Sequence, residues 1–362
     1  MSRYTCTRRR ALTALASFAA ASPLLRGQEP GGEPPGRLTP LGDFANAFEF
    51  EAMAKRRLDS LTFSAVAGGD RADLERITFR PRLMRDTTQL DLTTEMFGQS
   101  MFAPIIVGPT SQQQKIHADG ELAMLKGASA AKAVVVLSSL SSLPLDKIMA
   151  EAQTPPWYQV FPGPDVNVVR ARAQQAVKLG CKVLCITVGT PYEIAGASPL
   201  TDPSKLTAFG NPALDWSVID QLRQGLGVAV VLKGIMSPED ADTAVKRGVQ
   251  GIIVSNYGGR FVQGLASPIS MLPSIVDAVG GKIPVLVDGG FRRGTDVLKA
   301  LILGAKAVLL GRPPLWGLAA YGADGVQAVM ELMQSELARN LAMVSATTPK
   351  ELTRSMIKIH SR

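Results

Sequence analysis

The stretch "IPVLVDGGFRRGTDVLKALILGAKAVLLGR", residues 283–312, carries the clearest fold signal in the chain. It contains an apolar run over 283–290, a helical pattern over 293–305 and a second apolar run over 307–312. Apolar runs without polar alternation are typical of parallel strands that are buried on both faces. Glycines follow both runs, as they do where the backbone must come close to a ligand. The stretch therefore predicts one strand–helix–strand unit of a parallel sheet.

Similar units extend back along the chain to about residue 103. Further helical patterns cover 118–132, 165–180 and 237–248, and in the last of these Ser237-Pro238 is a good helix start. The other predicted strands lie at 104–109, 134–139, 157–161, 183–188, 228–234 and 251–256. Eight strands, each followed by a helix, predict an α/β fold of the (β/α)8 TIM barrel type in preference to an open doubly wound sheet. We expect a helical arm over residues 42–102 and a closing helix at the C-terminal end, over 348–359.

The N-terminal residues have the pattern of a targeting segment. Arg8, Arg9 and Arg10 precede an apolar run over 11–25, and a Gly/Pro/Glu-rich stretch follows it. Paired arginines before a short apolar region predict a twin-arginine signal peptide over 1–27, and hence export to a bacterial periplasm. A membrane anchor is the alternative, but the run is shorter than the ~20 residues that a spanning helix needs. We expect a flexible linker over 28–41 and the barrel domain over 42–362.

Charge and cysteine content exclude several functions. Residues 1–27 hold five arginines and no acid, so the remaining 34 basic and 31 acidic residues give a net charge of only +3. This balance argues against a nucleic-acid partner. Cys181 and Cys185 on one predicted strand would be about 13 Å apart, which is too far for a disulfide. No spacing of cysteines and histidines indicates a metal site.

The carboxyl ends of the predicted strands carry short polar side chains, one lysine and several glycines. In a TIM barrel these ends form the active site, and the last two strands commonly bind a phosphate. The set suits FMN, with Lys233 on the N1–O2 side of the flavin ring. Ordinary turns, or a barrel for a different phosphate ligand, are the alternatives. The candidate cofactor-binding residues are Pro109, Thr110, Ser138, Gln159, Thr187, Lys233, Ser255, Asp288, Gly289, Gly290, Arg292, Gly311 and Arg312.

Several motifs resemble those of the FMN-dependent 2-hydroxy-acid oxidase and dehydrogenase family, which includes glycolate oxidase and lactate oxidase. They include "PIIVGPT", "HADGE", "LSSLSS", "ITVGTP", "VLKGI" and "GIIVSN", and they span about residues 45–360 in order. The most specific is "VDGGFRRGTDVLKALILGAKAVLLGRP", residues 287–313. The resemblance implies a barrel, FMN bound by the strand-end residues given above, and a homo-oligomer that is often a tetramer.

The resemblance fails at the residues that carry the family's acid–base chemistry. Tyr257 stands where the family has its base, a histidine, and Gly189 stands where an aspartate orients that histidine. Of the groups that hold the substrate carboxylate, the arginine is kept as Arg260, whereas Phe161, Ala65 and Gly196 replace two tyrosines and a second arginine. An unperturbed phenol has a pKa of about 10 and is a poor base at neutral pH. We therefore expect weak oxidation of ordinary 2-hydroxy acids.

These features favour an exported FMN-dependent oxidoreductase with an altered substrate or mechanism. Its expected catalytic residues are Tyr257, as proton donor or substrate-orienting group, Arg260 and Lys233. The substrate would be a small anion, and an electron acceptor of a kind that the sequence does not identify would complete the reaction. The alternatives are a non-catalytic FMN-binding or ligand-sensing barrel, and residual 2-hydroxy-acid oxidation that uses Tyr257. His117 and His360 are expected to pack or to face solvent.

Overall fold

The computed structural model describes residues 38–189, 192–194, 206–208, 214–257 and 266–361. Residues Leu41–Arg362 form one compact unit. Its centre is an eight-stranded parallel sheet in the order β4-β13-β12-β11-β10-β7-β6-β5. The strands are β4 (Ile105–Val107), β5 (Val136–Ser138), β6 (Trp157–Val160), β7 (Val183–Thr187), β10 (Ala229–Ile235), β11 (Gly251–Val254), β12 (Val285–Val287) and β13 (Ala307–Leu310).

The two ends of this sheet meet and close the barrel. The amide of Val107 in β4 donates to the carbonyl of Val134 at 2.9 Å, and Val107 forms a parallel bridge with Val135 just before β5. All eight strands predicted from the sequence are present, and the predicted TIM barrel is confirmed. The strand interiors are mostly apolar and buried, which explains why their sequences show no polar alternation.

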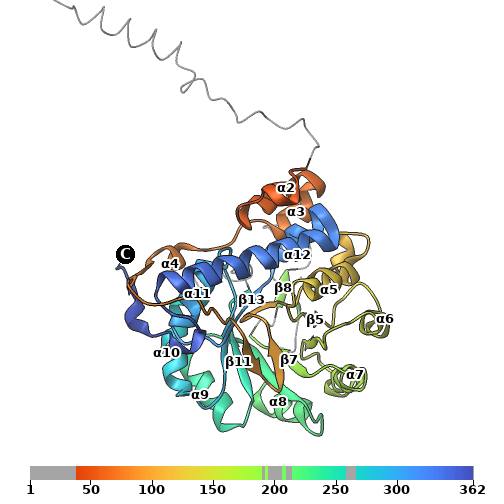
Figure 1. Ribbon diagram of the computed structural model, residues 1–362. Helices are drawn as coiled ribbons and strands as arrows, with labels where there is room; N and C mark the ends of the chain where they lie inside the picture. The colour runs from red at the N-terminus through yellow and green to blue at the C-terminus, as the bar shows by residue number, and fades with distance from the viewer. Residues whose placement is uncertain (1–37, 190–191, 195–205, 209–213, 258–265, 362) are drawn as a thin grey trace, which may run out of the picture. The chain divides into compact units, whose positions relative to one another are not determined.

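Helices surround the strands, as Figure 1 shows. The helices of the barrel are α5 (Gly120–Ala130), α6 (Leu145–Ala150), α7 (Val166–Lys178), α8 (Trp216–Arg223), α9 (Pro238–Lys246), α10 (Pro268–Val279), α11 (Gly294–Ile302) and α12 (Arg312–Met343). The long α12 contains a kink at Gly322, and it packs on α2, α5 and α11. None of the helices that the structure describes is long and apolar enough to cross a membrane.

The arm before the barrel is less helical than predicted. It contains the helices α2 (Phe48–Arg57), α3 (Ser60–Val66) and α4 (Ala72–Glu75) and the short 3-10 helix η1 (Leu41–Asp43). It also contains the strands β1 (Ile77–Phe79), β2 (Thr94–Met96) and β3 (Gln99–Met101), which the sequence did not predict. Strands of three residues are too short to show the alternation of apolar and polar residues that marks a strand in the sequence.

The β2–β3 hairpin closes the amino-terminal end of the barrel. Met96 and Met101 belong to the buried core, and the indole of Trp157, at the start of β6, donates to Gln99 Oε1 at 2.9 Å. The ring of Phe97 lies edge-on to Trp157 at 5.5 Å. The hairpin therefore plugs the end of the barrel opposite to the carboxyl ends of the strands.

The expected closing helix over 348–359 is wrong. This segment consists of two 3-10 turns, η5 (Pro349–Glu351) and η6 (Arg354–Met356), and the strand β14 (Ile357–Ile359). β14 pairs antiparallel with β1, with Ile77 opposite Ile359. Pairing with a strand about 280 positions away outweighs local helix propensity, and no local pattern reveals such a partner. The helix that closes the barrel is α12.

The expectations for Cys181, Cys185, His117 and His360 hold. Cys181 and Cys185 are free and buried, and burial raises the pKa of each thiol to about 12. His117 packs beside the kink of α12, since a Cβ on Gly322 would lie 3.1 Å from its Nε2. His360 is exposed, with its Nε2 2.8 Å from the hydroxyl of Thr78.

Ser237 caps α9 as predicted, because its hydroxyl accepts the amide of Asp240 at 3.1 Å. Replacing it with alanine removes this bond and is expected to lower the free energy of unfolding by about 1 kcal/mol. Urea unfolding measures the change. The exposed Ser274, which bonds only to the carbonyl of Met271 inside its own helix, provides the control variant Ser274→Ala. An equal loss in both variants would contradict the capping role.

Candidate functional site

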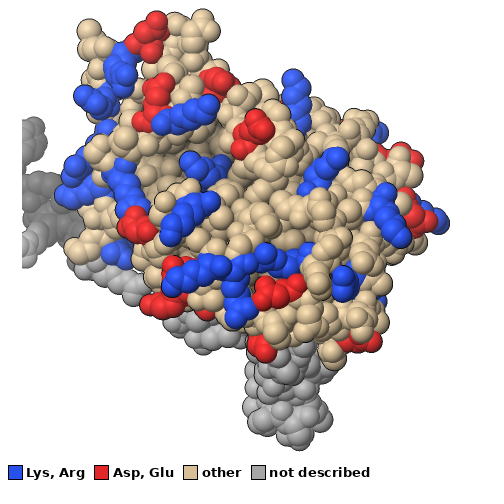
Figure 2. Space-filling model, turned by 90° about the horizontal axis from the view of Figure 1, so that it is seen from below, with Lys and Arg blue, Asp and Glu red and all other residues tan. Residues whose placement is uncertain are grey.

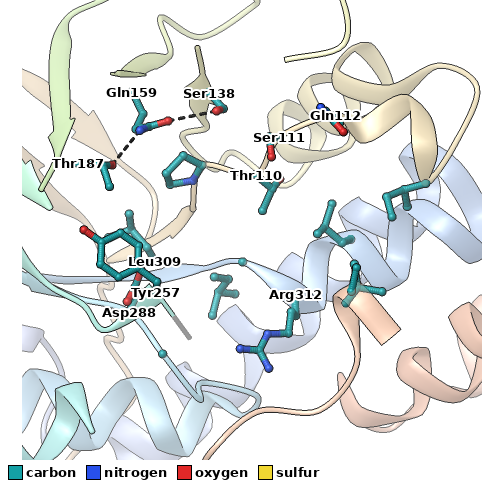
Figure 3. Close-up of a pocket in the computed structure, with 18 of the residues that line it drawn as sticks. Thr110, Ser111, Gln112, Ser138, Gln159, Thr187, Tyr257, Asp288, Leu309 and Arg312 are labelled. Atoms are coloured by element: carbon teal, nitrogen blue, oxygen red, sulfur yellow. Dashed lines mark hydrogen bonds between the residues drawn. The ribbon is translucent and has the colours of Figure 1, made fainter. Parts of the chain in front are cut away.

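A pocket of about 650 Å³ opens at the carboxyl ends of the barrel strands. Most of the site residues predicted from the sequence line this pocket. They are Pro109, Thr110, Ser138, Gln159, Thr187, Lys233, Tyr257, Asp288, Gly289, Gly290, Arg292, Gly311 and Arg312. They come from all parts of the barrel, so the fold brings together residues that lie more than 200 positions apart. Figure 3 shows how several of them lie around the pocket.

A hydrogen-bonded chain of three polar side chains lies on one wall. Gln159, at the end of β6, accepts the hydroxyl of Ser138 at 3.1 Å and donates to the hydroxyl of Thr187 at 2.8 Å (Figure 3). All three side chains are buried. These bonds fix the orientation of the Gln159 amide, and they leave the wall with oriented hydrogen-bonding groups for a planar polar ligand.

Lys233 of β10 lines the pocket, and it is only 6% exposed. Its Nζ lies 2.9 Å from Asp288 Oδ2 and donates to the hydroxyl of Ser255 at 2.8 Å. Burial alone would lower the pKa of the Lys233 ammonium, but the neighbouring Asp288 carboxylate outweighs burial, so the pKa is raised. The ion pair with Asp288 therefore favours the charged form of Lys233. Ser255 does not line the pocket; it lies behind Lys233 and holds it.

Two arginines form the opposite end of the pocket. Nη2 of Arg292 and Nη1 of Arg312 both donate to the carbonyl of Gly68 at 2.6 Å. Burial, together with the charges of Arg312 and Arg71, lowers the pKa of the Arg292 guanidinium. Gly69 has a φ of +150°, and a Cβ there would lie 2.6 Å from Arg292 Nη2. The close packing of two guanidiniums against backbone carbonyls favours an anion at this end.

Inorganic phosphate is expected to raise the thermal midpoint of the flavin-free protein, because an anion would offset the repulsion between Arg292 and Arg312. Phosphate at ten times its Kd should stabilise the protein by about 1.4 kcal/mol. Differential scanning calorimetry with chloride at equal ionic strength as control measures this. Arg312→Met should remove most of the shift. An equal shift in that variant would contradict an anion site here.

Tyr257 follows β11 in a left-handed conformation, with a φ of 58°. Its ring lines the pocket, and its phenol oxygen is buried. A Cβ added to Gly189 would lie 3.4 Å from this oxygen, and a Cβ added to Gly234 would lie 2.6 Å from it. The predicted base position and the predicted position of its orienting acid are therefore neighbours in space. Nζ of Lys233 lies 5.1 Å from the centre of the Tyr257 ring.

The other positions that correspond to the family's substrate site are only partly described. Phe161 and Ala65 line the pocket, as the resemblance implies. Arg260 and Gly196 lie outside the described residues. Of the loop after β7, the structure describes the antiparallel pair β8 (Tyr192–Ile194) and β9 (Leu206–Ala208).

The arm contributes a wall of the pocket that the sequence did not predict. Leu61, Thr62, Ser64 and Val66 of α3 line the pocket together with Ala65. Their pattern is that of an ordinary helix, and only the position of α3 over the strand ends makes them part of the site. Lys115 and Gln112, which follow β4, also line it and were not predicted.

The pocket fits FMN in three respects. The two guanidiniums suit a phosphate, and the Gln159 wall suits the polar edge of the flavin ring. Asp288 Oδ1 is buried and has no hydrogen-bond partner among the described residues, so it can accept a hydroxyl from a sugar-alcohol chain. Within the described ranges, no cluster of three or more His, Cys, Asp or Glu side chains could hold a metal ion.

Comparison with known families agrees with this geometry. The model of the FMN-dependent dehydrogenase family matches residues 64–198 and 192–359. The chain belongs to this family. Members of the family use FMN, and the residues of the pocket fit it.

Characterised relatives are oxidases of 2-hydroxy acids. An L-lactate oxidase of Nostoc is 35% identical over 89% of this chain and 100% of its own length. The human 2-hydroxyacid oxidase 1 is 36% identical over 77% of this chain and 84% of its own. Among solved structures, mandelate oxidase with benzoyl-formic acid has a TM-score of 0.79 at 34% identity, covering 87% of this chain and 98% of its own. The chain is therefore an oxidoreductase of the FMN-dependent 2-hydroxy-acid oxidase family.

Proposed function

We propose that the protein is an FMN-dependent oxidoreductase whose substrate does not need the family's histidine base. The observation that carries this proposal is a pocket lined by all the predicted flavin-binding residues except Ser255, in which a Cβ on Gly189 would lie 3.4 Å from the Tyr257 hydroxyl. General-base catalysis contributes typically 10²–10⁴-fold to a rate. A chain that has lost both the base and its orienting acid is suited to a substrate that is already activated, or to the reductive direction.

The side chains of the site have distinct tasks in this proposal. FMN, when bound, supplies hydride transfer. Lys233, held by Asp288 and Ser255, keeps a fixed positive charge beside the ring-binding wall. Arg260 pairs with an anionic group of a small substrate, as its counterpart does in the family. Arg292 and Arg312 hold the phosphate of the cofactor.

A non-catalytic flavin-binding or ligand-sensing barrel is the second candidate. The joint replacement of the base and its orienting acid favours it, because neither Tyr257 nor Gly189, which lie close together, supplies the family's acid–base pair. The two candidates differ in whether the bound flavin turns over with any substrate.

Turnover of the flavin decides between them. The purified protein is reduced anaerobically by light and then mixed with a 2-oxo acid, a quinone or oxygen. Reoxidation by one of the organic acceptors, saturable in its concentration, is expected for the oxidoreductase. A flavin that is reoxidised by oxygen alone, and that no organic donor reduces, would contradict it. Replacing Lys233 with methionine should slow the reaction in the first case.

We further propose that the protein is exported by the twin-arginine route and forms a homo-oligomer. The support is the Arg8-Arg9-Arg10 cluster before the apolar run, and the oligomer that the family resemblance implies. Replacing Arg8 and Arg9 with lysine should retain the protein in the cytoplasm, as cell fractionation would show. Unchanged export would contradict the route, and light scattering of the purified protein measures the oligomer.

A further inference from the structure

The hydroxyl and the ring of Tyr257 have different surroundings. The phenol oxygen is buried, in a crevice formed by the backbone that follows β7 and by the end of β10. Two glycines make this crevice. A Cβ at Gly234 would lie 2.6 Å from the oxygen, and a Cβ at Gly189 would lie 3.4 Å from it, so a longer side chain at Gly189 can reach the oxygen.

The orientation of the ring agrees with this placement. In Figure 3 the hydroxyl of Tyr257 lies on the side of its ring that faces away from Arg312. The Lys233 ammonium lies 5.1 Å from the ring centre, at a distance typical of a cation–π contact. Its contacts with Asp288 and Ser255 hold that ammonium in place, so the tyrosine is fixed at both its hydroxyl and its ring.

We infer that the ring of Tyr257 forms part of the pocket wall that contacts the substrate, and that it determines which substrates bind. Gly189 and Gly234 are positioning residues that hold the Tyr257 hydroxyl in the crevice. This inference rests on the proposed function and changes one part of it, the role of proton donor expected for Tyr257. A buried hydroxyl that points into the protein cannot exchange a proton with a substrate in the pocket.

The wall indicates what the pocket accepts. Phe161 and Ala65 line the same pocket as Tyr257, at positions where the family resemblance implies tyrosine hydroxyls. These three side chains offer aromatic and methyl surface without an accessible hydroxyl. Such a surface binds the apolar substituent of a substrate, and ring-on-ring contact adds to burial alone.

The crevice can be tested in the flavin-free protein, independently of any activity. The protein is labelled with 3-fluorotyrosine, and Tyr257→Phe assigns the fluorine signal of residue 257. Gly189→Leu should move that signal, because the new side chain displaces the phenol. Gly180→Leu is the matched control. Both glycines are exposed, and their φ angles are similar, +104° at Gly180 and +97° at Gly189. A Cβ at Gly180, however, would have a single neighbour within 4 Å, Cε of Met149 at 4.0 Å, so the control adds the same side chain away from Tyr257. A signal that stays in place in Gly189→Leu, or moves equally in both variants, would overturn the inference.

The role of the ring is tested with two probes in the flavin-loaded protein. Benzoylformate and pyruvate are both 2-oxo acids, but benzoylformate has a phenyl group where pyruvate has a methyl group. Their binding is measured by the change in the flavin spectrum. Tyr257→Phe should keep the preference for benzoylformate over pyruvate, and Tyr257→Ala should reduce it by about 2- to 10-fold. A loss of preference in Tyr257→Phe as large as in Tyr257→Ala would show that the hydroxyl acts on the ligand. If the protein binds no flavin, the proposed function fails while the fluorine result still stands.

Discussion

The double variant Tyr257→His/Gly189→Asp is expected to oxidise L-lactate or glycolate about 10²–10⁴-fold faster than the unmodified protein. The expectation follows from the contact between the two positions: a Cβ at Gly189 would point to the end of the residue-257 side chain, 3.4 Å from its oxygen. A carboxylate there can fix the tautomer of a histidine and stabilise its charged form. The rate is measured by anaerobic stopped-flow mixing.

Each single variant should gain far less. Tyr257→His alone lacks the orienting acid. Gly189→Asp alone must fit beside the phenol, at a φ of +97° that strains any side chain. The control is Tyr257→His/Gly180→Asp, which adds the same two residue types with the acid on an exposed turn. A double variant that binds flavin and is no faster than this control would contradict the interpretation of the two positions.

Replacing Lys233 with methionine is expected to lower the free energy of unfolding by about 3–5 kcal/mol. Without the ammonium at 2.9 Å, the Asp288 carboxylate is left without its counter-charge, and its Oδ1 already has no partner among the described residues. Urea unfolding of the flavin-free protein measures the loss.

The matched control for this loss is Lys233→Met/Asp288→Leu, which removes both charges. It should recover much of the stability, because well-packed apolar residues can replace a buried ion pair at little cost. A loss below about 1 kcal/mol in Lys233→Met alone would show that solvent screens Asp288 well, and that the pair is not a buried one.

The sequence predicts the barrel well because its information is local. Each strand is an apolar run with glycine or a polar residue at its carboxyl end, and Ser237 and Pro238 fix where α9 begins. The TIM barrel then places all eight carboxyl ends together, so the sequence alone was enough to assign Gln159, Lys233 and Asp288 to one pocket.

What the sequence could not show depends on pairs that are distant along the chain. β1 and β14 pair across almost the whole barrel domain, and three residues give no periodic signal. The α3 wall of the pocket is visible only after the arm has folded over the strand ends. The proximity of Gly189 to Tyr257 was implied only by the family resemblance, since a glycine in a turn has many uses. Ser255 looked like a ligand contact and instead supports Lys233.

We interpret the pocket as one that binds flavin but lacks the family's histidine base. Anaerobic mixing of the purified, flavin-loaded protein with L-lactate and glycolate tests this interpretation most directly. We predict that the absorption band of the oxidised flavin persists over many seconds and bleaches only when dithionite is added. Bleaching by either acid within seconds would contradict this, because Tyr257 or another group of the chain would then act as a working base.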